Sequence, residues 1–458
     1  MGRLKIGERT AYLAYSTNVH PAETLAELSQ MLRQHVGPIS RGAFGPNTAA
    51  INLRLGIQQI DDLLGNPALP TTSTLSDDIL KASPTPACQE LLDLLKQLDL
   101  AVVSINAFPI RNFHSPRVKE QVYSPPWTDG GRALYSLKIA KVMAHFMTAS
   151  PWKPKRTAIS VPSGVYNGLY ADSDEIRAQC AHFLTECVRE LYRLERLTGC
   201  TVQLGLEPEP LTTGETCAQF IEYYGAILFD ARQKFALQLG LSRAQAEELA
   251  RRFLTVNLDL CHQAVEFEDP LEDLKQLKAA GVPVSGLHLS AALKLKEPGK
   301  NLERLKPWDE PRYLHQVVAH TAPSPLTPLP RGGEGNRSGG ELTRFEDLPH
   351  LWDERKLKGK SLSDFDELRC HFHVPLFAEF SDGALSTTRD CVGPAARYAL
   401  REGMTDNFVV ETYTWNVLAA LAREGNAAAK AVMGEAGIDV DAGIVKELQW
   451  ANEMLNDE

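Results

Sequence analysis

The chain lacks several features that mark other classes of protein. Its eight cysteines form no C-x-x-C pair, which disfavours a zinc knuckle and indicates a reduced, cytoplasmic protein. No stretch approaches the ~18 consecutive apolar residues that a membrane-spanning helix needs. The polar residues 1–8 lack the apolar core of a signal peptide. The absence of Walker A, G-x-G-x-x-G and G-x-S-x-G motifs disfavours nucleotide binding and serine-hydrolase chemistry.

Basic charge is also scarce. The chain has 48 Lys and Arg residues against 58 Asp and Glu residues, which gives a net charge of −10 at pH 7. Affinity for nucleic acid or for an anionic membrane depends on Lys and Arg side chains. We therefore expect neither as a partner, and the composition is typical of a soluble α/β enzyme or binding protein.

Strand-like and helical segments alternate along almost the whole chain. The eight strand candidates are residues 10–19, 100–108, 157–161, 201–207, 254–260, 283–289, 370–377 and 407–412. Each is followed by a helical pattern, and eight such units are the number that a (β/α)₈ barrel requires. A doubly wound parallel sheet could also hold eight strands. We predict an α/β protein with a single (β/α)₈ TIM barrel that spans residues 1–458 and carries insertions.

Two segments interrupt this alternation. Residues 37–83 are rich in turn-forming residues, with one short helical segment around residues 57–64. Residues 321–341 are rich in Pro, Gly and Ser and nearly free of apolar side chains. Such a composition cannot offset its conformational entropy by burial, so we predict a disordered surface insertion within the barrel.

Ionisable side chains lie at the ends of successive predicted strands. They are Glu207, Asp259, His288 and Glu411 at strand ends, His262 three residues after Asp259, and His371 and His373 inside a strand. Catalytic groups of barrels project from the C-terminal strand ends, where these residues would offer oxygen and nitrogen ligands to a divalent cation. Each alone has a structural explanation, because a carboxylate can cap a turn and a histidine can be a hydrogen-bonded core residue. Their succession favours a shared metal site.

A long aromatic and cationic loop follows the second predicted strand, at residues 108–127. Loops of this length at the functional face of a barrel are commonly lids or substrate clamps. Arg111, His114, Arg117 and Lys119 could hold a phosphate or a carboxylate. An ordinary solvated loop is the alternative.

Several motifs resemble a known superfamily. The segments LGLEPEP (204–210), NLDLCH (257–262), GLHLSAAL (286–293) and FVVET (408–412) resemble the xylose-isomerase-like TIM-barrel superfamily, which includes sugar phosphate isomerases and epimerases and an endonuclease branch. The segments AYSTNVHPAETLAEL, INAFPIRNFHSPRVKEQVYSPPW and VETYTWNVL more narrowly resemble the EboE family, the metabolite traffic proteins of bacterial ebo clusters.

The resemblance implies a divalent metal at the barrel mouth. The Glu, Asp, His and Glu ligands of epimerase-like members match Glu207, Asp259, His288 and Glu411, and a substrate contact or second-metal ligand of the superfamily matches His262. The endonuclease branch carries Asp-x-His where this chain has His-x-His, and a further histidine that this chain lacks after its third predicted strand. Cleavage of DNA is therefore not expected.

We hypothesise proton transfer next to a carbonyl of a small, polar, sugar- or cyclitol-like metabolite or its phosphate. Glu207 and Glu411 would be the catalytic acid and base, and the metal would be Mn²⁺, Zn²⁺, Co²⁺ or Mg²⁺. The substrate-binding candidates are His262, His371, His373, His114, Arg111 and Lys119. A non-catalytic metabolite-binding protein and a metal-dependent phosphoesterase remain as alternatives.

Overall fold

A closed barrel of eight parallel strands forms the centre of the fold. The computed structural model describes residues 2–6, 9–65, 77–111, 113–322, 340–380, 383–433 and 439–456. Neighbouring strands pair in the order β2-β14-β8-β7-β6-β5-β4-β3, and a parallel bridge between Ser16 and Asn52 joins the two ends. The strands are β2 (Arg9–Tyr15), β3 (Ala49–Arg54), β4 (Leu100–Asn106), β5 (Arg156–Pro162), β6 (Thr201–Glu207), β7 (Leu254–Asp259), β8 (Val284–Leu289) and β14 (Asn407–Val410). The fold is a single (β/α)₈ barrel with insertions, as the sequence predicts.

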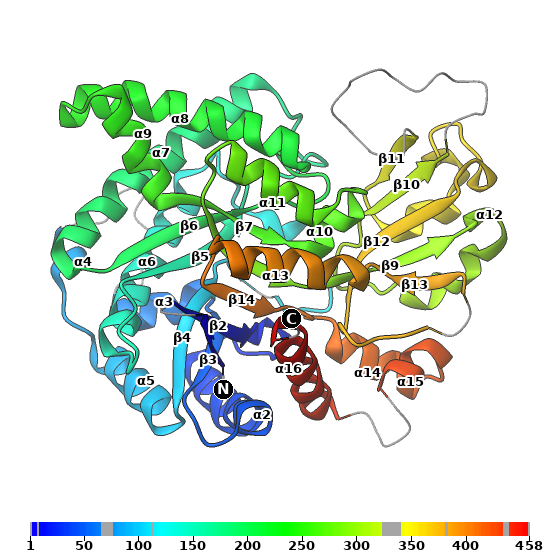
Figure 1. The fold of residues 1–458 in the computed structure, drawn as a ribbon, viewed down its shortest axis with the longest axis horizontal. Helices are drawn as coiled ribbons and strands as arrows, with labels where there is room; N and C mark the ends of the chain where they lie inside the picture. Colours follow the sequence, from blue (N-terminus) through cyan, green and yellow to red (C-terminus); the bar gives the residue numbers. More distant parts are fainter. Residues whose placement is uncertain are drawn as a thin grey trace.

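Helices surround the barrel (Figure 1). Strands β3, β4, β7 and β14 are buried at every position, because side chains point both into the barrel and toward these helices. The short N-terminal strand β1 (Arg3–Ile6) pairs antiparallel with β2. The α-helices up to β7 are α1 (Leu25–Met31), α2 (Gly37–Phe44), α3 (Ile57–Leu64), α4 (Asp77–Lys81), α5 (Pro86–Gln97), α6 (Gly130–Ala149), α7 (Asp174–Thr198), α8 (Cys217–Leu239) and α9 (Arg243–Phe253). Those after β7 are α10 (Leu260–Val265), α11 (Pro270–Ala279), α12 (Pro298–Asn301), α13 (Val392–Glu402), α14 (Trp415–Arg423), α15 (Ala427–Met433) and α16 (Val440–Asn456). Among the described residues, no helix combines the length and apolar character needed to cross a membrane.

Two strand predictions were wrong, although the predicted total of eight is right. Residues 370–377 do not form a barrel strand, because most of them belong to β12 (Glu367–Val374) in a separate antiparallel sheet. Residues 49–54, inside the segment predicted to be irregular, form barrel strand β3. An apolar run shows that a strand is buried but does not identify its pairing partners, which explains the first error. The second arose because β3 lies within a stretch rich in turn-forming residues.

The separate sheet is inserted between β8 and β14. Its strand order is β11-β10-β12-β9-β13, and every pairing in it is antiparallel. Figure 1 shows this sheet beside the barrel, mostly in yellow. Its strands are β9 (Ala291–Lys296), β10 (Val317–Thr321), β11 (Glu341–Phe345), β12 (Glu367–Val374) and β13 (Leu385–Thr387). Most of the predicted disordered insertion, residues 323–339, lies outside the described residues. Its ends meet where Thr321 of β10 pairs with Glu341 of β11.

Glu447 anchors the C-terminal helix α16 to the barrel. Its Oε1 accepts hydrogen bonds from the backbone N of Leu376 at 2.9 Å and from Oγ1 of Thr412 at 2.8 Å, and its Oε2 accepts from Nε1 of Trp415 at 3.0 Å. Burial raises the pKa of Glu447 to about 7 despite these donors. One side chain thus connects α16 to the segments that follow β12 and β14.

A cluster of carboxylates around Arg344 connects the inserted sheet to the barrel, at the segments before α8 and after α10. The Arg344 guanidinium of β11 forms ion pairs with Glu215 at 3.0 Å and with Glu266. Burial, together with the charge of Glu215, raises the pKa of Glu266 to about 8, and burial raises the pKa of Glu268 to about 7. Two carboxylates therefore share one guanidinium, whose positive charge also acts on the buried Glu268.

We expect Glu447→Ala to destabilise the protein. The substitution leaves three buried donors without an acceptor, and each such group costs about 1–3 kcal/mol. Urea unfolding should show a loss of at least ~2 kcal/mol, allowing for partial hydration. The control Glu453→Ala changes an exposed glutamate of the same helix and should have little effect. Equal stabilities of the two variants would show that Glu447 does not anchor α16.

We expect Arg344→Met to make stability depend more steeply on pH. A carboxyl group whose pKa is raised on folding keeps its proton in the folded state while the unfolded chain releases it. The contribution of this group to the stability of the fold is therefore complete below its unfolded pKa, near 4.5. It is lost as the pH rises through the folded pKa, which is about 8 for Glu266. Removing the guanidinium raises these folded pKa values further. Urea unfolding at pH 5 and pH 8 should show the larger loss at pH 8, whereas Arg355→Met, in an exposed ion pair, should show neither effect. An equal loss at both pH values would contradict this linkage.

Candidate functional site

Four ionisable side chains converge at the C-terminal ends of four neighbouring barrel strands. Glu207 ends β6, Asp259 ends β7, His288 lies next to the end of β8, and Glu411 directly follows β14. Each offers one potential ligand atom, and these atoms all lie within 4.8 Å of one another. The structure thus brings together the four residues that the superfamily resemblance implied as metal ligands. We refer to them as the carboxylate cluster.

Glu207 and His288 are positioned by Asn257. Oε2 of Glu207 accepts hydrogen bonds from Nδ2 of Asn257 at 2.9 Å and from Oγ of Ser160, and the same Nδ2 lies 3.0 Å from Nε2 of His288. Gly286 makes room for this amide, since a Cβ at that position would lie 2.1 Å from Oδ1 of Asn257. The missing side chain at Gly286 of β8 therefore allows Asn257 to contact both Glu207 and His288.

Glu411 and Asp259 also use one oxygen each for outer hydrogen bonds. Oε1 of Glu411 accepts from Nδ2 of Asn18 at 2.8 Å and from Nδ2 of Asn106 at 3.0 Å. Oδ1 of Asp259 accepts from Oγ of Ser290 at 2.7 Å. In every carboxylate of the cluster, the second oxygen is left facing the other members.

The inner atoms of Glu207 and Asp259 lie near His288 at separations close to those of ligands to one ion, and Glu411 lies within hydrogen-bond distance of the same nitrogen. Nδ1 of His288 lies 2.6 Å from Oε2 of Glu411, 3.4 Å from Oε1 of Glu207 and 3.6 Å from Oδ2 of Asp259. Oδ2 of Asp259 has no hydrogen-bond partner among the described residues. Two ligands that each lie ~2.1 Å from a metal are separated by about 3–3.5 Å. A buried oxygen without a partner, in a set of three carboxylates and one imidazole, fits a divalent cation.

Neighbouring opposite charges keep Glu207 and Asp259 ionised. Burial opposes charge on Asp259, but His262, His373 and His288 outweigh it and hold the pKa of Asp259 well below its ordinary value. The pKa of Glu207 is also lowered, because His288 overcomes the effect of burial. Burial likewise opposes charge on His288, yet Glu411 and Glu207 hold its pKa well above the ordinary value. Ionised carboxylates are the form that binds a cation.

Three histidines form a second group beside the first. Nε2 of His371 lies 3.1 Å from Nε2 of His262 and 3.2 Å from Nε2 of His373. Asp259 stands between the groups, with Oδ1 4.0 Å from Nε2 of His262 and Oδ2 4.0 Å from Nε2 of His373. Burial and the neighbouring imidazoles lower the pKa of His371 well below its ordinary value, and burial lowers the pKa of His373. We call His262, His371 and His373 the histidine cluster. His371 and His373 reach the barrel mouth from the inserted sheet, not from a barrel strand.

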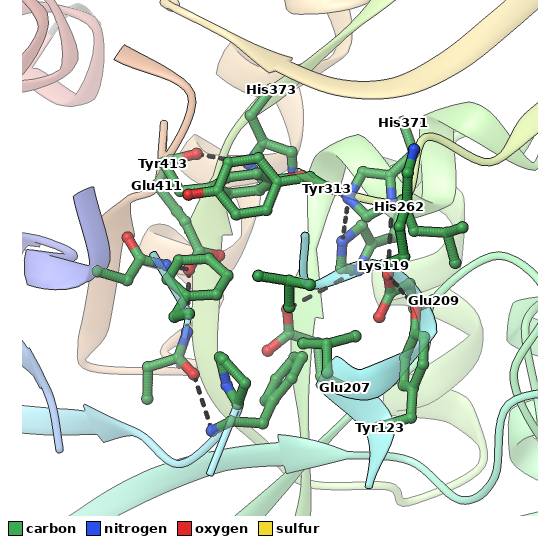
Figure 2. A pocket seen from close by; sticks show the side chains of 18 residues that line it. Lys119, Tyr123, Glu207, Glu209, His262, Tyr313, His371, His373, Glu411 and Tyr413 are labelled. Atoms are coloured by element: carbon green, nitrogen blue, oxygen red, sulfur yellow. Dashed lines mark hydrogen bonds and ion pairs between the residues drawn. The ribbon is translucent and has the colours of Figure 1, made fainter. Parts of the chain in front are cut away.

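Both clusters face one cavity (Figure 2). Its ionisable lining residues are Lys119, Glu207, Glu209, His262, His371, His373 and Glu411, and its aromatic ones are Phe108, Phe113, Tyr123, Tyr313 and Tyr413. Asp259 and His288 are not part of this lining. Two members of the carboxylate cluster thus reach the cavity, while the other two lie behind them.

The cationic loop contributes less to the cavity than the sequence suggested. Lys119 lines it, but its Nζ lies 2.6 Å from Oδ2 of Asp347 in a buried ion pair. Arg111 is exposed and His114 is only partly buried, and neither lines the cavity. Burial and the nearby Arg54 guanidinium lower the pKa of His114 to about 4, so its ring is neutral near pH 7. Arg117 is also exposed and does not line the cavity, so of the four candidates in this loop only Lys119 reaches it, and its charge is already paired.

Several residues of the site were missed in the sequence. They are Asn18, Asn106, Ser160, Asn257 and Ser290 around the carboxylate cluster, and Tyr123, Glu209 and Gln316 beside the histidine cluster. Glu209 had a local signal, because it follows Glu207 by two residues in the same motif. Gln316 had none, since it precedes a strand of the inserted sheet that the sequence did not reveal.

The chain has no matching family model and no matching curated protein. Among solved structures it is similar to a probable 3-DHS dehydratase, AsbF from Bacillus anthracis, described as involved in petrobactin synthesis. The two share 11% sequence identity over 92% of this chain and 99% of that chain, with a TM-score of 0.39. It is also similar to an L-ribulose 3-epimerase, at 12% identity over 99% of this chain and 95% of that chain, with a TM-score of 0.42. The chain's own strand order defines the barrel, and neither likeness assigns an activity to it.

Proposed function

We propose that the chain is a metal-dependent isomerase or epimerase that moves a proton next to the carbonyl of a sugar- or cyclitol-like metabolite. One observation carries the proposal: of the four converging residues, Glu207 and Glu411 alone line the cavity. They come from β6 and β14, with β7 and β8 between them. Two carboxylates that reach one cavity from separate strands can act on two faces of the same carbon.

Glu207 and Glu411 are proposed as the acid and base of this reaction. The lowered pKa of Glu207 keeps its carboxylate ready to accept a proton from carbon. Oε1 of Glu411 is fixed by Asn18 and Asn106, which holds the carboxylate at the cavity wall. Removal of a proton by one group and its return by the other inverts the carbon or moves the carbonyl.

Glu207, Asp259, His288 and Glu411 are proposed as the metal ligands. When bound there, a divalent metal supplies Lewis-acid polarisation of the substrate carbonyl. The oxygen-rich donor set suits Mn²⁺, Co²⁺, Zn²⁺ or Mg²⁺. Asp259 and His288, behind the cavity wall, would serve only this ligand role.

The substrate is proposed to be uncharged. Among the described residues that line the cavity, Lys119 is the one Lys or Arg side chain, and its charge is paired with Asp347. The aromatic side chains provide an apolar wall, and the histidine cluster provides polar groups that can meet hydroxyl oxygens. A neutral polyol with a carbonyl fits these features better than a sugar phosphate does.

We also propose kinship with the EboE family, supported by the sequence segments that resemble it. This kinship would place the protein in an ebo-type secondary-metabolite pathway and in the cytoplasm. All eight cysteines are free, which agrees with a reducing compartment. A traffic role without chemistry would use the same cavity but would exchange no proton, so the test below separates the two.

Hydrogen–deuterium exchange tests the reaction. The Mn²⁺-loaded protein is incubated in D₂O with neutral ketoses, keto-cyclitols and ketose phosphates, and deuterium next to the carbonyl is measured by NMR. We expect incorporation into a neutral substrate and a loss of about 10²–10⁴-fold in Glu207→Gln and Glu411→Gln. Metal content is measured in each variant, so that loss of the ion is not mistaken for loss of the base.

Glu453→Gln, on the outer surface of α16, is the control and should exchange at the wild-type rate. Tight binding of one metabolite with no exchange would favour the traffic role instead. Exchange that persists in both cavity variants would contradict the assigned acid and base.

Gly286→Ala should weaken metal binding although it replaces none of the proposed metal ligands. The added Cβ would collide with Oδ1 of Asn257 and displace the amide that holds Glu207. Loss of such outer support typically lowers metal affinity by about 10–100-fold. Titration with Mn²⁺ should show this drop, while Gly225→Ala, where a Cβ meets no atom within 4 Å, should leave the affinity unchanged. Equal affinities would contradict the positioning role of Asn257.

A further inference from the structure

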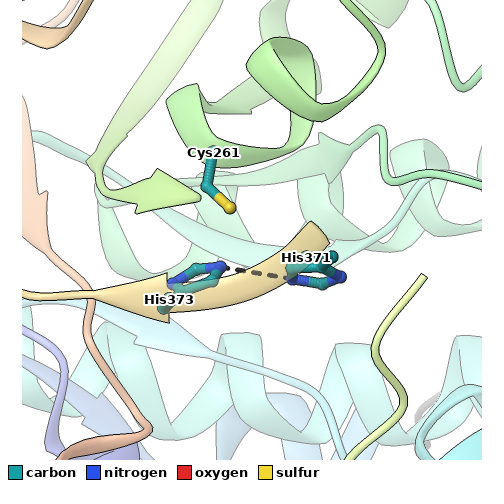
Figure 3. A group of neighbouring side chains, drawn as sticks. All are labelled: Cys261, His371 and His373. Atoms are coloured by element: carbon teal, nitrogen blue, oxygen red, sulfur yellow. Dashed lines mark hydrogen bonds between the residues drawn. The ribbon is translucent and has the colours of Figure 1, made fainter. Parts of the chain in front are cut away.

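The thiol of Cys261 lies beside two histidines of the cavity. Figure 3 shows it next to His371 and His373, and its sulfur lies within 4.8 Å of their ligand atoms. Burial and the charge of Asp259 raise the pKa of this thiol well above its ordinary value, and a thiol that keeps its proton is a poor ligand. Cys261 therefore adds no new site at the barrel mouth.

A different group of possible metal ligands lies outside the cavity. Among the described residues, one such group shares no member with the carboxylate cluster or the histidine cluster, and it consists of His20, His35 and Asp441. Each residue offers one ligand atom, and these atoms all lie within 4.8 Å of one another. None of the three lines the cavity. The group is therefore separate from the candidate active site.

Three separate segments bring these side chains together. His20 follows a short helical turn (Thr17–Val19) after β2, His35 lies in a turn of π-helix (Leu32–Val36) between α1 and α2, and Asp441 lies in the first turn of α16. Turns of π-helix are rare and frequently occur at functional sites. A ligand held by all three side chains would connect the C-terminal helix to the N-terminal part of the barrel.

A hydrogen bond already joins two of the three side chains. Nδ1 of His35 lies 2.9 Å from Oδ2 and 3.1 Å from Oδ1 of Asp441. The ring of His35 is also stacked on that of His20, with the centroids 4.9 Å apart. The side chains of His35 and Asp441 are 43% and 29% exposed, so an ion can reach them from solvent and both can adjust to it.

Two buried polar atoms next to this pair have no partner among the described residues. They are Nε2 of His20 and the hydroxyl oxygen of Tyr15, whose rings meet edge to face. Burial, and then the charge of Asp441, raise the pKa of Tyr15 well above its ordinary value, which places that carboxylate near the hydroxyl. Buried polar atoms without partners are costly. The hydrogen bond between His35 and Asp441 explains neither of these atoms.

The ring of His20 is in the form that binds a metal. Burial lowers its pKa to about 3, and His35 and His114 act in the same direction. The ring is therefore neutral near pH 7, and one of its nitrogens has a lone pair without a proton. A neutral imidazole is the form of histidine that ligates metal ions.

We propose that His20, His35 and Asp441 bind a divalent metal ion, Zn²⁺ or an ion of similar preference, at a site separate from the barrel mouth. Two imidazoles and one carboxylate suit Zn²⁺ and Co²⁺, and a water molecule completes a tetrahedral set. The hydroxyl of Tyr15 is then a hydrogen-bond partner for this water. The partly exposed ring of His35 turns out of its stack on His20, so that a nitrogen of each ring faces the ion.

The ion would attach α16 to the segment that follows β2. Glu447 holds the middle of this helix, and the metal would hold its first turn. Because none of the three ligands lines the cavity, the ion acts on the stability of this attachment and does not meet the substrate. The inference is independent of the reaction proposed above.

Hydrogen exchange of the α16 amides tests the site. The full chain is stripped with a chelator, and exchange is measured by mass spectrometry with and without Zn²⁺. The ion is released when the first turn of α16 opens, so Zn²⁺ at about ten times its Kd should slow this exchange by about 10-fold. Elemental analysis after gel filtration gives the metal content per chain.

Two variants each remove one proposed ligand. His35→Ala and Asp441→Ala change partly exposed side chains, so the chain should keep its fold. Each variant should bind one equivalent of Zn²⁺ less than the wild type and should lose the slowing of exchange in α16.

Three further variants are matched controls. His182→Ala changes an exposed histidine of α7, and Glu453→Ala changes an exposed carboxylate of α16. Both should respond to Zn²⁺ as the wild type does. His288→Gln removes a proposed ligand at the barrel mouth and should keep the response of α16. Loss of that response in His288→Gln would show that the ion acts from the barrel mouth, which would overturn the proposal.

Exchange in α16 that is the same with and without Zn²⁺ would also contradict the site. The same holds for a wild-type metal content in both His35→Ala and Asp441→Ala. No substrate is used, so a failure of deuterium incorporation and a failure of this metal site are separate results.

Discussion

The site depends on one electrostatic constraint, because three carboxylates are buried within a few ångströms of one another at the barrel mouth. Like charges at this separation in a medium of low dielectric constant are costly unless each is compensated. Amide and hydroxyl donors on β4, β5 and β7 and after β2 and β8 hold the outer oxygens. The inner oxygens of Glu207, Asp259 and Glu411 are left to His288. These hydrogen bonds orient the inner carboxylate oxygens toward the centre of the carboxylate cluster. The resulting concentration of negative charge suits a cation.

The inserted sheet is part of the site as well as part of the surface. Strand β12 supplies His371 and His373, and the residue before β10, Gln316, fixes the ring of His371. Asp347, which follows β11, neutralises Lys119 of the loop after β4. The barrel alone would therefore present the carboxylate cluster to an open mouth. The insertion adds the second group of nitrogen donors and a wall of the cavity.

The sequence predicted the fold and the carboxylate cluster because both depend on local patterns. Each of Glu207, Asp259 and Glu411 ends an apolar run, and the barrel topology makes such strand ends converge. The sheet to which each strand belongs was less predictable. Strand β12 is as buried as a barrel strand but pairs antiparallel with β9 and β10. The ion pair between Lys119 and Asp347 joins residues 228 positions apart, so the loop looked more cationic than it is. Long-range partners of this kind leave no mark on the local sequence.

The cavity separates two kinds of recognition. Phe113, Tyr313 and Tyr413 form a connected aromatic wall, with ring centroids 5.0–5.9 Å apart, and Tyr413 also contacts His373 at 4.7 Å. The ionisable groups lie beside this wall, and the one lysine among them, Lys119, is paired with Asp347. A polyol that enters would bury its apolar ring face against the aromatic side chains. Its oxygen atoms would then turn toward Glu207, Glu411 and the imidazoles. Orientation of the reacting carbon therefore follows from the shape and polarity of the cavity and requires no anionic handle on the substrate.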